Sequence, residues 1–250
     1  MRGVILAGGT GSRLRPITNV TNKHLLPVGR YPMIYYPIYA LREAGISDIL
    51  IVTGKEHMGD VVNLLGSGRQ WGTRFTYRVQ DEAGGIAQAL SLAEDFAQAD
   101  RIVVILGDNV FSESLAVHVQ AFQNQPAGAR VLLQEVQDPS RFGVPVFEDR
   151  RIVRIDEKPV RPLSSYCVTG IYMYDSKVFD VIRTLKPSQR GELEITDVNN
   201  YYIGKGQLGW SILSGWWTDA GTFESLAVAN QLAAGLDRDM DVFMEAARSL

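Results

Sequence analysis

The stretch GVILAGGTGSRLRP, residues 3–16, decides how the rest of the chain is interpreted. Its apolar run Val4–Ala7 predicts a short strand buried on both faces, because it has no polar residue to turn toward solvent. The glycines that follow, Gly8, Gly9 and Gly11, predict a loop whose backbone N–H groups can approach an anion closely, since glycine has no Cβ. We therefore expect a strand that ends in an anion-binding loop.

Two common phosphate-binding loops do not fit this stretch. A dinucleotide fingerprint needs a glycine three residues after Gly11, where the chain has Leu14, and an acidic residue about twenty positions further on, which is missing. A P-loop ends in Gly-Lys-Ser/Thr, whereas the segment from Gly8 leads to Arg13 and Leu14. An NAD-dependent dehydrogenase and a P-loop NTPase are therefore both disfavoured.

Strand-like and helical patterns alternate after this loop. Predicted strands cover Ile49–Thr53, Phe75–Gln80 and Ile102–Leu106, and predicted helices cover Pro32–Gly45, Asp60–Leu65 and Ile86–Ala97. Such alternation is typical of parallel strands joined by helical crossovers. We therefore expect an α/β fold with three layers, α/β/α, around a mixed, mostly parallel central sheet.

The pattern changes after Val131. Residues Gly143–Pro159 predict a hairpin that turns at Glu148–Asp149, and Tyr166–Asp175 predicts a further strand. These strands suggest an antiparallel extension of the sheet. A last helix is expected from Thr222 to about Ala234. Four tail residues at helical spacing predict that the tail packs on the body or on a neighbour: Met240, Phe243, Ala247 and Leu250.

The composition sets further limits. The chain has 250 residues, 46% hydrophobic, and a net charge of −3, which gives no reason to expect a nucleic-acid or membrane partner. A single cysteine, Cys167, excludes a disulfide framework and favours a reducing, cytoplasmic location. No acidic residue precedes Glu43, whereas six basic residues do, namely Arg2, Arg13, Arg15, Lys23, Arg30 and Arg42. A segment in which every charged side chain is basic favours a polyanionic small ligand.

A series of motifs resembles the sugar-1-phosphate nucleotidyltransferase family along nearly the whole chain. After the opening loop these motifs are NKHLLPVGRYPMIYYPI (22–38), QDEAGGIAQAL (80–90), LGDN (106–109), RFGV (141–144), EKP (157–159), VTGIYMYD (168–175), RGELEITDVN (190–199) and WTDAGT (217–222). The resemblance implies a Rossmann-like nucleotide-diphospho-sugar transferase fold with an antiparallel sugar-binding extension. It also implies one domain, residues 1–236, with a nucleotide-binding part (1–110) and a sugar-phosphate-binding part (111–236), followed by a helical tail (237–250).

The activity that the resemblance implies is transfer of dTMP from dTTP to glucose 1-phosphate, with Mg²⁺ as cofactor and with dTDP-glucose and pyrophosphate as products. A sugar phosphate is already largely ionised at neutral pH, because its second pKa is about 6, so the attack needs no general base. Members that use UTP or another sugar 1-phosphate remain an alternative, as does a non-catalytic sensor of nucleotide sugars. The family further implies a homotetramer that supplies dTDP-rhamnose and related dTDP-sugars.

The resemblance also assigns residues. Arg13, Lys23 and Asp108 are the expected catalytic residues. The expected nucleotide-binding residues are Leu6, Gly8, Gly9, Thr10, Gly11, Ser12, Arg13, Lys23, Gln80, Gly85 and Asp108. The expected sugar-phosphate-binding residues are Asn109, Gly143, Glu157, Lys158, Thr169, Gly170 and Arg190. Asp108, which follows a predicted buried strand, and the distant Asp219 are the expected Mg²⁺ ligands.

Three features depart from the family's pattern. Ser12 stands where threonine is common, His24 stands where many members have glutamine, and Phe142 replaces a frequent tyrosine. The chain also ends soon after the expected last helix, whereas longer members carry further helices that build a regulatory nucleotide site. The sequence therefore leaves open whether feedback inhibition through such a site operates here.

Overall fold

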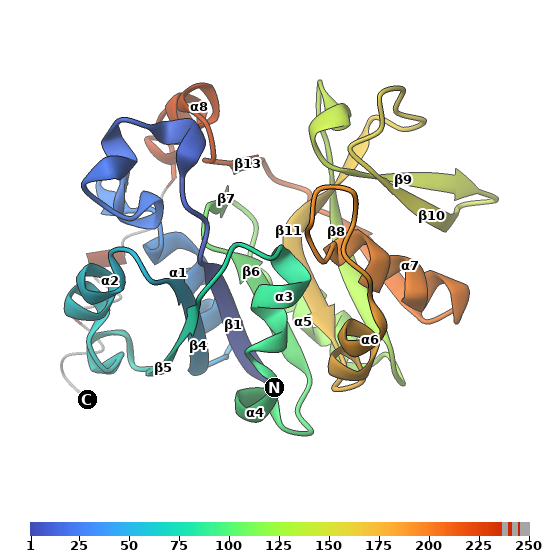
Figure 1. The fold of residues 1–250 in the computed structure, drawn as a ribbon, viewed down its shortest axis with the longest axis horizontal. Helices are drawn as coiled ribbons and strands as arrows, with labels where there is room; N and C mark the ends of the chain where they lie inside the picture. Colours follow the sequence, from blue (N-terminus) through green and yellow to red (C-terminus); the bar gives the residue numbers. More distant parts are fainter. Residues whose placement is uncertain (237–239, 242–244, 246–250) are drawn as a thin grey trace.

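The structure is a computed structural model that describes residues 1–236, 240, 241 and 245. Its centre is a seven-stranded sheet in the order β12-β8-β11-β6-β1-β4-β5 (Figure 1). The strands are β1 (Arg2–Ala7), β4 (Asp48–Gly54), β5 (Arg74–Gln80), β6 (Ile102–Leu106), β8 (Ala129–Glu135), β11 (Tyr166–Tyr174) and β12 (Leu208–Ile212). The strand pairs β1–β4, β1–β6, β4–β5 and β8–β12 are parallel, and only β11 runs antiparallel to its two neighbours. The predicted mixed, mostly parallel sheet is confirmed.

Two hydrophobic cores, one on each face of the sheet, make up the three layers. One core contains side chains of α1 (Tyr35–Glu43), α2 (Met58–Leu65), α5 (Ala116–Gln123) and α8 (Phe223–Ala233). The other contains side chains of α3 (Ile86–Ser91), α4 (Glu94–Ala97), α6 (Val178–Thr184) and α7 (Ile195–Gly204). Residues of β1 alternate between the cores, with Ile5 in the first and Val4 and Leu6 in the second, as the pleat of a strand requires.

The predicted helices differ in their bounds from those observed, and α2 begins at Met58 rather than at Asp60. The helix predicted from Pro32 begins at Tyr35, because Pro32 belongs to the short pair β2 (Pro27–Val28) and β3 (Tyr31–Pro32). Pro37 lies in the first turn of α1, where a backbone N–H has no partner within the helix, so it is tolerated.

The helix predicted over 86–97 is divided into α3 and α4. The N–H groups of Leu92 and Ala93 donate to carbonyls three residues back, which tightens the chain between the two helices.

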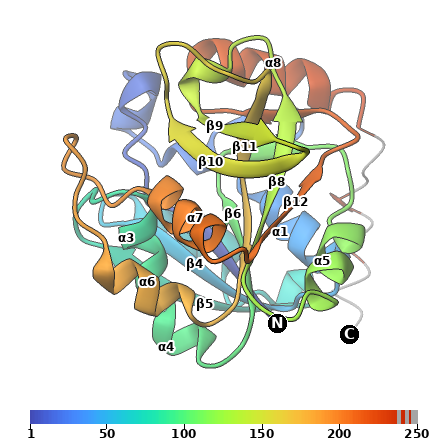
Figure 2. The same ribbon diagram turned by 90° about the vertical axis from the view of Figure 1, so that its right-hand side faces the viewer.

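The predicted hairpin is β9 (Gly143–Glu148) with β10 (Arg151–Glu157), and it forms a separate two-stranded sheet. Its turn residues are Asp149 and Arg150, one position later than expected, and both have positive φ, as a two-residue hairpin turn prefers. The hairpin lies at the end of the sheet where β1 terminates (Figures 1 and 2). Neither β8 nor the edge strand β12 was predicted from the sequence.

The last helix is confirmed, and its start has a clear cause. Thr222 caps α8 through a capping box with Ser225. In the tail, Met240 is buried in the first core, whereas Phe243, Ala247 and Leu250 lie outside the described residues. Within the described part of the chain, no helix is long and apolar enough to cross a membrane.

Candidate active site

The glycine-rich loop turns back over the end of β1. Gly11 has φ +64° and begins the 3-10 helix η1 (Ser12–Leu14), a left-handed conformation that favours glycine. Its carbonyl accepts a hydrogen bond of 2.8 Å from the Leu14 N–H. Gly8 packs against Gln80 so closely that a Cβ there would overlap Gln80 Oε1. Because these glycines have no side chains, the loop can contact Gln80 at the end of β5, and the other side of the loop stays open.

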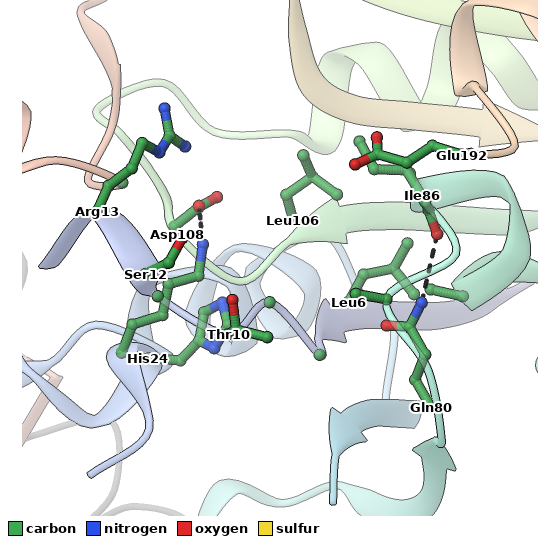
Figure 3. A pocket seen from close by; sticks show the side chains of 18 residues that line it. Leu6, Thr10, Ser12, Arg13, His24, Gln80, Ile86, Leu106, Asp108 and Glu192 are labelled. Atoms are coloured by element: carbon green, nitrogen blue, oxygen red, sulfur yellow. Dashed lines mark hydrogen bonds and ion pairs between the residues drawn. The ribbon is translucent and has the colours of Figure 1, made fainter. Parts of the chain in front are cut away.

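A cleft of about 350 Å³ opens beside this loop (Figure 3). All the residues that the sequence analysis assigns to the nucleotide line it: Leu6, Gly8, Gly9, Thr10, Gly11, Ser12, Arg13, Lys23, Gln80, Gly85 and Asp108. Figure 3 shows Arg13 and Asp108 toward one end of the cleft and Gln80 toward the other. Basic side chains thus lie at one end of the cleft, where phosphates would be neutralised, whereas the other end has the amide of Gln80 together with the carboxylate of Glu192.

Asp108 and Asp219 reach the same place from distant parts of the sequence. Asp108 lies just before β7 (Asn109–Phe111), and β7 pairs with β13 (Trp217–Asp219) so that Asn109 lies opposite Asp219. The Ala220 N–H donates to the Asp108 carbonyl at 2.8 Å. A Cβ built on Gly221 would lie 3.5 Å from Asp219 Oδ2 and 3.6 Å from Asp108 Oδ2. Both carboxylates therefore face one small space.

Two basic side chains adjoin this space. The same Cβ on Gly221 would lie 3.1 Å from Arg13 Nη2, and Lys23 Nζ donates to Asp108 Oδ2 at 2.5 Å. Burial, the largest single influence, would raise the pKa of Asp108, but the charge of Lys23, the ring of His24 and the hydrogen bonds from Lys23 and Asn109 together outweigh it and hold that pKa below its usual range. Asp108 is therefore ionised at neutral pH.

The second carboxylate behaves in the opposite way. Burial, and after it the negative charge of Asp108, raises the pKa of Asp219 from 3.8 to about 6, although Arg141 lies 3.4 Å from Asp219 Oδ2. Two neighbouring carboxylates that disfavour each other's charge are stabilised by a cation between them, and oxygen ligands are the kind that Mg²⁺ prefers. The donor set thus fits a divalent cation.

His24 lines the cleft without contributing charge. Burial, and after it the charge of Lys23, lowers the pKa of His24 to about 3. Its Nδ1 lies 2.7 Å from Asn22 Oδ1, which holds the ring in place. The residue that replaces the family's frequent glutamine is therefore a neutral, fixed wall of the cleft.

Gln80 is held by its amide nitrogen. Nε2 donates to Gln88 Oε1 at 2.6 Å and to the Gly85 carbonyl at 3.4 Å. A Cβ on Gly85 would collide with the backbone of Leu193, so glycine is required where the chain crosses there. Because Nε2 is occupied, Oε1 is the group that Gln80 can offer to a ligand, as an acceptor.

A second cleft, of about 190 Å³, adjoins the first. The two clefts share Arg13, Ile86, Leu106, Asp108 and Glu192. The second cleft is also lined by Asp219 and by most of the predicted sugar-phosphate residues, namely Asn109, Gly143, Glu157, Lys158, Gly170 and Arg190. Its own walls therefore combine carboxylates, cations and apolar surface.

Charged groups in the second cleft form a network around Glu157. Thr196 Oγ1 donates to Glu157 Oε2 at 2.6 Å, and Arg190 Nη2 donates to Glu157 Oε1 at 3.3 Å. Arg190 also donates to both carboxylate oxygens of Glu194 at 2.8 Å. Lys158 has φ +46°, a strained conformation for a residue with a side chain. Its Nζ lies 3.5 Å from Glu157 Oε1, so the network holds two cations and two carboxylates on one wall.

Two predicted sugar residues have structural roles. Thr169 does not line the cleft, because its fully buried hydroxyl donates to the Leu132 carbonyl within the sheet. Its hydroxyl is therefore used within the sheet, and the expected contribution of its backbone to the sugar pocket stays a prediction. Asn109 lines the cleft, but its Oδ1 accepts from the Gly170 N–H (2.9 Å) and from Trp217 Nε1 (2.6 Å), so it joins β11 to β13 beside Asp108.

Several residues of the clefts were not assigned from the sequence. Glu192 borders both clefts, and Thr196, Asn199 and Trp217 line the second. Thr196 and Asn199 are three residues apart on α7, a spacing that places them on one face of a helix. That spacing, within the quoted motif at 190–199, is the signal that could have revealed them.

The chain matches known proteins over nearly its full length. A profile of the nucleotidyl transferase family matches residues 2–234. The glucose-1-phosphate thymidylyltransferase of Neisseria meningitidis serogroup A is 46% identical over 230 residues, which cover 90% of this chain and 80% of that protein. The enzyme of the same name from an Actinoplanes species is 41% identical over 245 residues, covering 97% and 81%.

Solved structures agree with these matches. A Bacillus anthracis chain, assigned as a glucose-1-phosphate thymidylyltransferase and crystallised in complex with a sucrose, is 64% identical, with a TM-score of 0.92 and coverage of 95% and 97%. A UDP-glucose pyrophosphorylase complexed with UDP-glucose is 25% identical, with a TM-score of 0.82 and coverage of 93% and 98%. On its sequence, its fold and the cleft at the end of β1, this chain belongs to the nucleotidyl transferase family.

Proposed function

We propose that this protein transfers dTMP from dTTP to glucose 1-phosphate in an Mg²⁺-dependent reaction that gives dTDP-glucose and pyrophosphate. Glucose-1-phosphate thymidylyltransferases at 41–46% identity support the choice of substrates. The observation that carries the proposal is the junction of the two clefts. Arg13 and Asp108 line both clefts, and Asp219 faces the same space.

The reaction follows from what each cleft can hold. A triphosphate in the first cleft would place its phosphates beside the glycine loop, Arg13 and Lys23, and a sugar phosphate in the second would extend toward Lys158 and Arg190. An oxygen of the sugar phosphate attacks the α-phosphorus, and a new P–O bond forms. The bond from the α-phosphorus to its bridging oxygen breaks, and pyrophosphate leaves with the electron pair.

Proton transfer is not needed in this step. The sugar phosphate is largely dianionic at neutral pH, and pyrophosphate is a stable leaving group. The protein therefore acts by orienting the two phosphates and by neutralising charge. Arg13 would stabilise negative charge on the departing pyrophosphate, and Lys23, which lies beside Asp108, would contact the phosphate chain.

Asp108 and Asp219 would hold the magnesium ion. Two carboxylates suit Mg²⁺, which takes few protein ligands and would share its remaining positions between substrate phosphates and water. When bound, the ion neutralises phosphate charge and orients the reacting groups. The raised pKa of Asp219 fits this role, because the ion removes the repulsion between the carboxylates.

Gln80 in the first cleft would recognise the base, and Glu157 in the second cleft would recognise the sugar. Gln80 Oε1 accepts the N3–H of thymine, which has the same imide edge as uracil. Glu157 accepts hydrogen bonds from sugar hydroxyls. Discrimination between thymine and uracil depends on room for one methyl group, which changes selectivity by only about 10- to 200-fold.

The test is product identification with purified protein. Protein, Mg²⁺, glucose 1-phosphate and either dTTP or UTP are incubated, and the nucleotide sugar is identified by mass spectrometry. Other sugar 1-phosphates serve as a second series. We expect dTDP-glucose to form with the highest kcat/KM. Faster turnover of UTP or of another sugar would replace the substrate assignment, and the absence of any nucleotide sugar would refute the transferase role.

The wider context of the reaction is also part of the proposal. We infer a cytoplasmic homotetramer whose product supplies dTDP-rhamnose and related dTDP-sugars. We also infer that residues 1–110 bind mainly the nucleotide and residues 111–236 mainly the sugar phosphate, while the tail 237–250 lies mostly outside the described residues. Sedimentation equilibrium measures the assembly, and four chains per particle is the expected result.

A further inference from the structure

Asn199, on α7, is a buried polar residue with an unused hydrogen-bonding group. Its side chain is 1% exposed and lines the second cleft. Its Oδ1 accepts a hydrogen bond of 2.7 Å from the Tyr174 hydroxyl. Among the described residues, Nδ2 has no protein acceptor, and it is not one of the fully enclosed side-chain atoms that lack a partner, so it stays accessible from the cleft. An amide N–H₂ group that lines a cleft and has no protein acceptor can donate a hydrogen bond to a ligand or to water.

The amide is fixed by a ladder of aromatic rings. The ring of Tyr174 stacks on Tyr172 with centroids 6.1 Å apart and planes 15° apart, and it lies 6.0 Å from the ring of Tyr202. The Tyr202 hydroxyl donates to Asp175 at 2.8 Å. The Tyr174 hydroxyl, which positions Asn199, is therefore itself held by packing on both sides. This rigidity leaves Nδ2 in one orientation.

The surroundings of Asn199 suit a hydroxyl better than a phosphate. Thr196, three residues earlier on α7, donates to the Glu157 carboxylate. A Cβ on Gly143 would lie 3.3 Å from Thr196 Oγ1 and 3.7 Å from Glu157 Oε2, so these groups surround one part of the cleft. A carboxylate repels a phosphate dianion but accepts hydrogen bonds from hydroxyl groups, and a neutral amide can donate to a hydroxyl oxygen.

We propose that Asn199 determines sugar specificity by donating a hydrogen bond from Nδ2 to one hydroxyl oxygen of the hexose 1-phosphate. Tyr174 acts as a positioning residue that sets the orientation of this amide. The inference rests on the proposed function, because it assigns a role within the sugar-phosphate cleft. It predicts that one hexose hydroxyl is recognised by Asn199 together with the neighbouring Glu157.

The experiment uses Asn199→Leu, which keeps the size of the side chain and removes the amide. Wild type and variant are compared with glucose 1-phosphate and with its 2-, 3-, 4- and 6-deoxy analogues. We expect kcat/KM for glucose 1-phosphate to fall about 10- to 100-fold, with the KM for dTTP unchanged. One deoxy analogue should be a poorer substrate than glucose 1-phosphate for the wild type but not for the variant. The reason is that the variant already lacks the hydrogen bond to that hydroxyl.

Three controls separate the possible failures. Asn63→Leu makes the same change on the exposed face of α2 and should leave all kinetic constants unchanged. Tyr174→Phe keeps the amide but removes the hydroxyl that positions it, so it should weaken recognition of the same hydroxyl by a smaller factor. Thermal unfolding identifies a variant that does not fold, in which case Tyr174→Phe carries the test.

The proposal is overturned if Asn199→Leu folds and discriminates among all deoxy analogues as the wild type does. It is equally overturned if the activity toward every analogue falls by one common factor, because that result indicates a structural role. If the wild type makes no nucleotide sugar at all, the proposed function fails instead, before any variant is compared.

Discussion

Replacing Asp219 by asparagine should stabilise the metal-free protein while it removes activity. In the folded chain, burial and the charge of Asp108 raise the pKa of Asp219 from 3.8 to about 6. The ionised carboxylate is therefore disfavoured in the folded state relative to the unfolded state. A shift of this size corresponds to about 3 kcal/mol, since one pKa unit is 1.36 kcal/mol. Asparagine has nearly the same shape and carries no charge, so it should remove this penalty.

The sign of the effect depends on pH. The folded state holds the proton of Asp219 more tightly, so the penalty is fully present above pH 6 and disappears as the pH falls toward 3.8. We expect Asp219→Asn to raise the melting temperature by about 6 to 12 °C at pH 8 in EDTA, for a chain of this length. The gain in the free energy of unfolding should fall to roughly half at pH 5.

The assay is thermal and urea unfolding of both proteins in EDTA and in Mg²⁺ with a non-hydrolysable dTTP analogue. Addition of metal and nucleotide should stabilise the wild type and have little effect on the variant, because one of the two carboxylate ligands is gone. Equal stability of the two proteins at pH 8 in EDTA would refute the reasoning, as would a gain that does not change between pH 8 and pH 5. Either result would mean that burial and the charge of Asp108 do not raise the pKa of Asp219 in the folded protein.

Three further predictions concern the other charged and polar groups. Lys23→Met leaves the buried Asp108 carboxylate without its cation and should lower the free energy of unfolding by about 3 kcal/mol or more, as measured by urea denaturation. The double variant Lys23→Met, Asp108→Asn should recover much of that stability. A Lys23→Met variant as stable as the wild type would contradict the pairing of Lys23 with Asp108. Gln80→Leu should raise the KM for dTTP at least about tenfold without changing the KM for glucose 1-phosphate in steady-state kinetics; the reverse pattern would exclude contact with the base. Glu157→Gln should have the opposite effect, raising the KM for glucose 1-phosphate about tenfold while the KM for dTTP stays unchanged. An equal rise in both KM values would indicate a general loss of structure.

Much of the fold and of the first cleft could be predicted from the sequence, because both depend on local patterns. The apolar runs of β1, β4 and β6 are continuous, as expected for strands covered on both faces. Glycine is needed at Gly11, where the loop changes direction with a positive φ, and at Gly85, where the chain crosses the backbone of Leu193.

The remaining features depend on contacts between distant segments. The edge strand β12 is only partly buried and contains glycine and serine, so its sequence has no strong strand pattern. The structural use of Thr169 could not be predicted, because it depends on which carbonyl of β8 lies opposite its hydroxyl. Asn199 was not predicted for a similar reason, because its position depends on a hydrogen bond from Tyr174, which is 25 residues away in the sequence. Pairing of β7 with β13, which brings Asp219 to Asp108, is likewise a long-range event.

The most direct measurement is a crystal structure with Mg²⁺, glucose 1-phosphate and a non-hydrolysable dTTP analogue. We predict one metal ion about 2.1 Å from an oxygen of Asp108 and from an oxygen of Asp219, with the triphosphate along the glycine loop and the sugar phosphate directed at its α-phosphorus. An ion bound to neither aspartate, or a triphosphate that lies away from Arg13, would contradict the claim that the junction of the two clefts is the reaction centre.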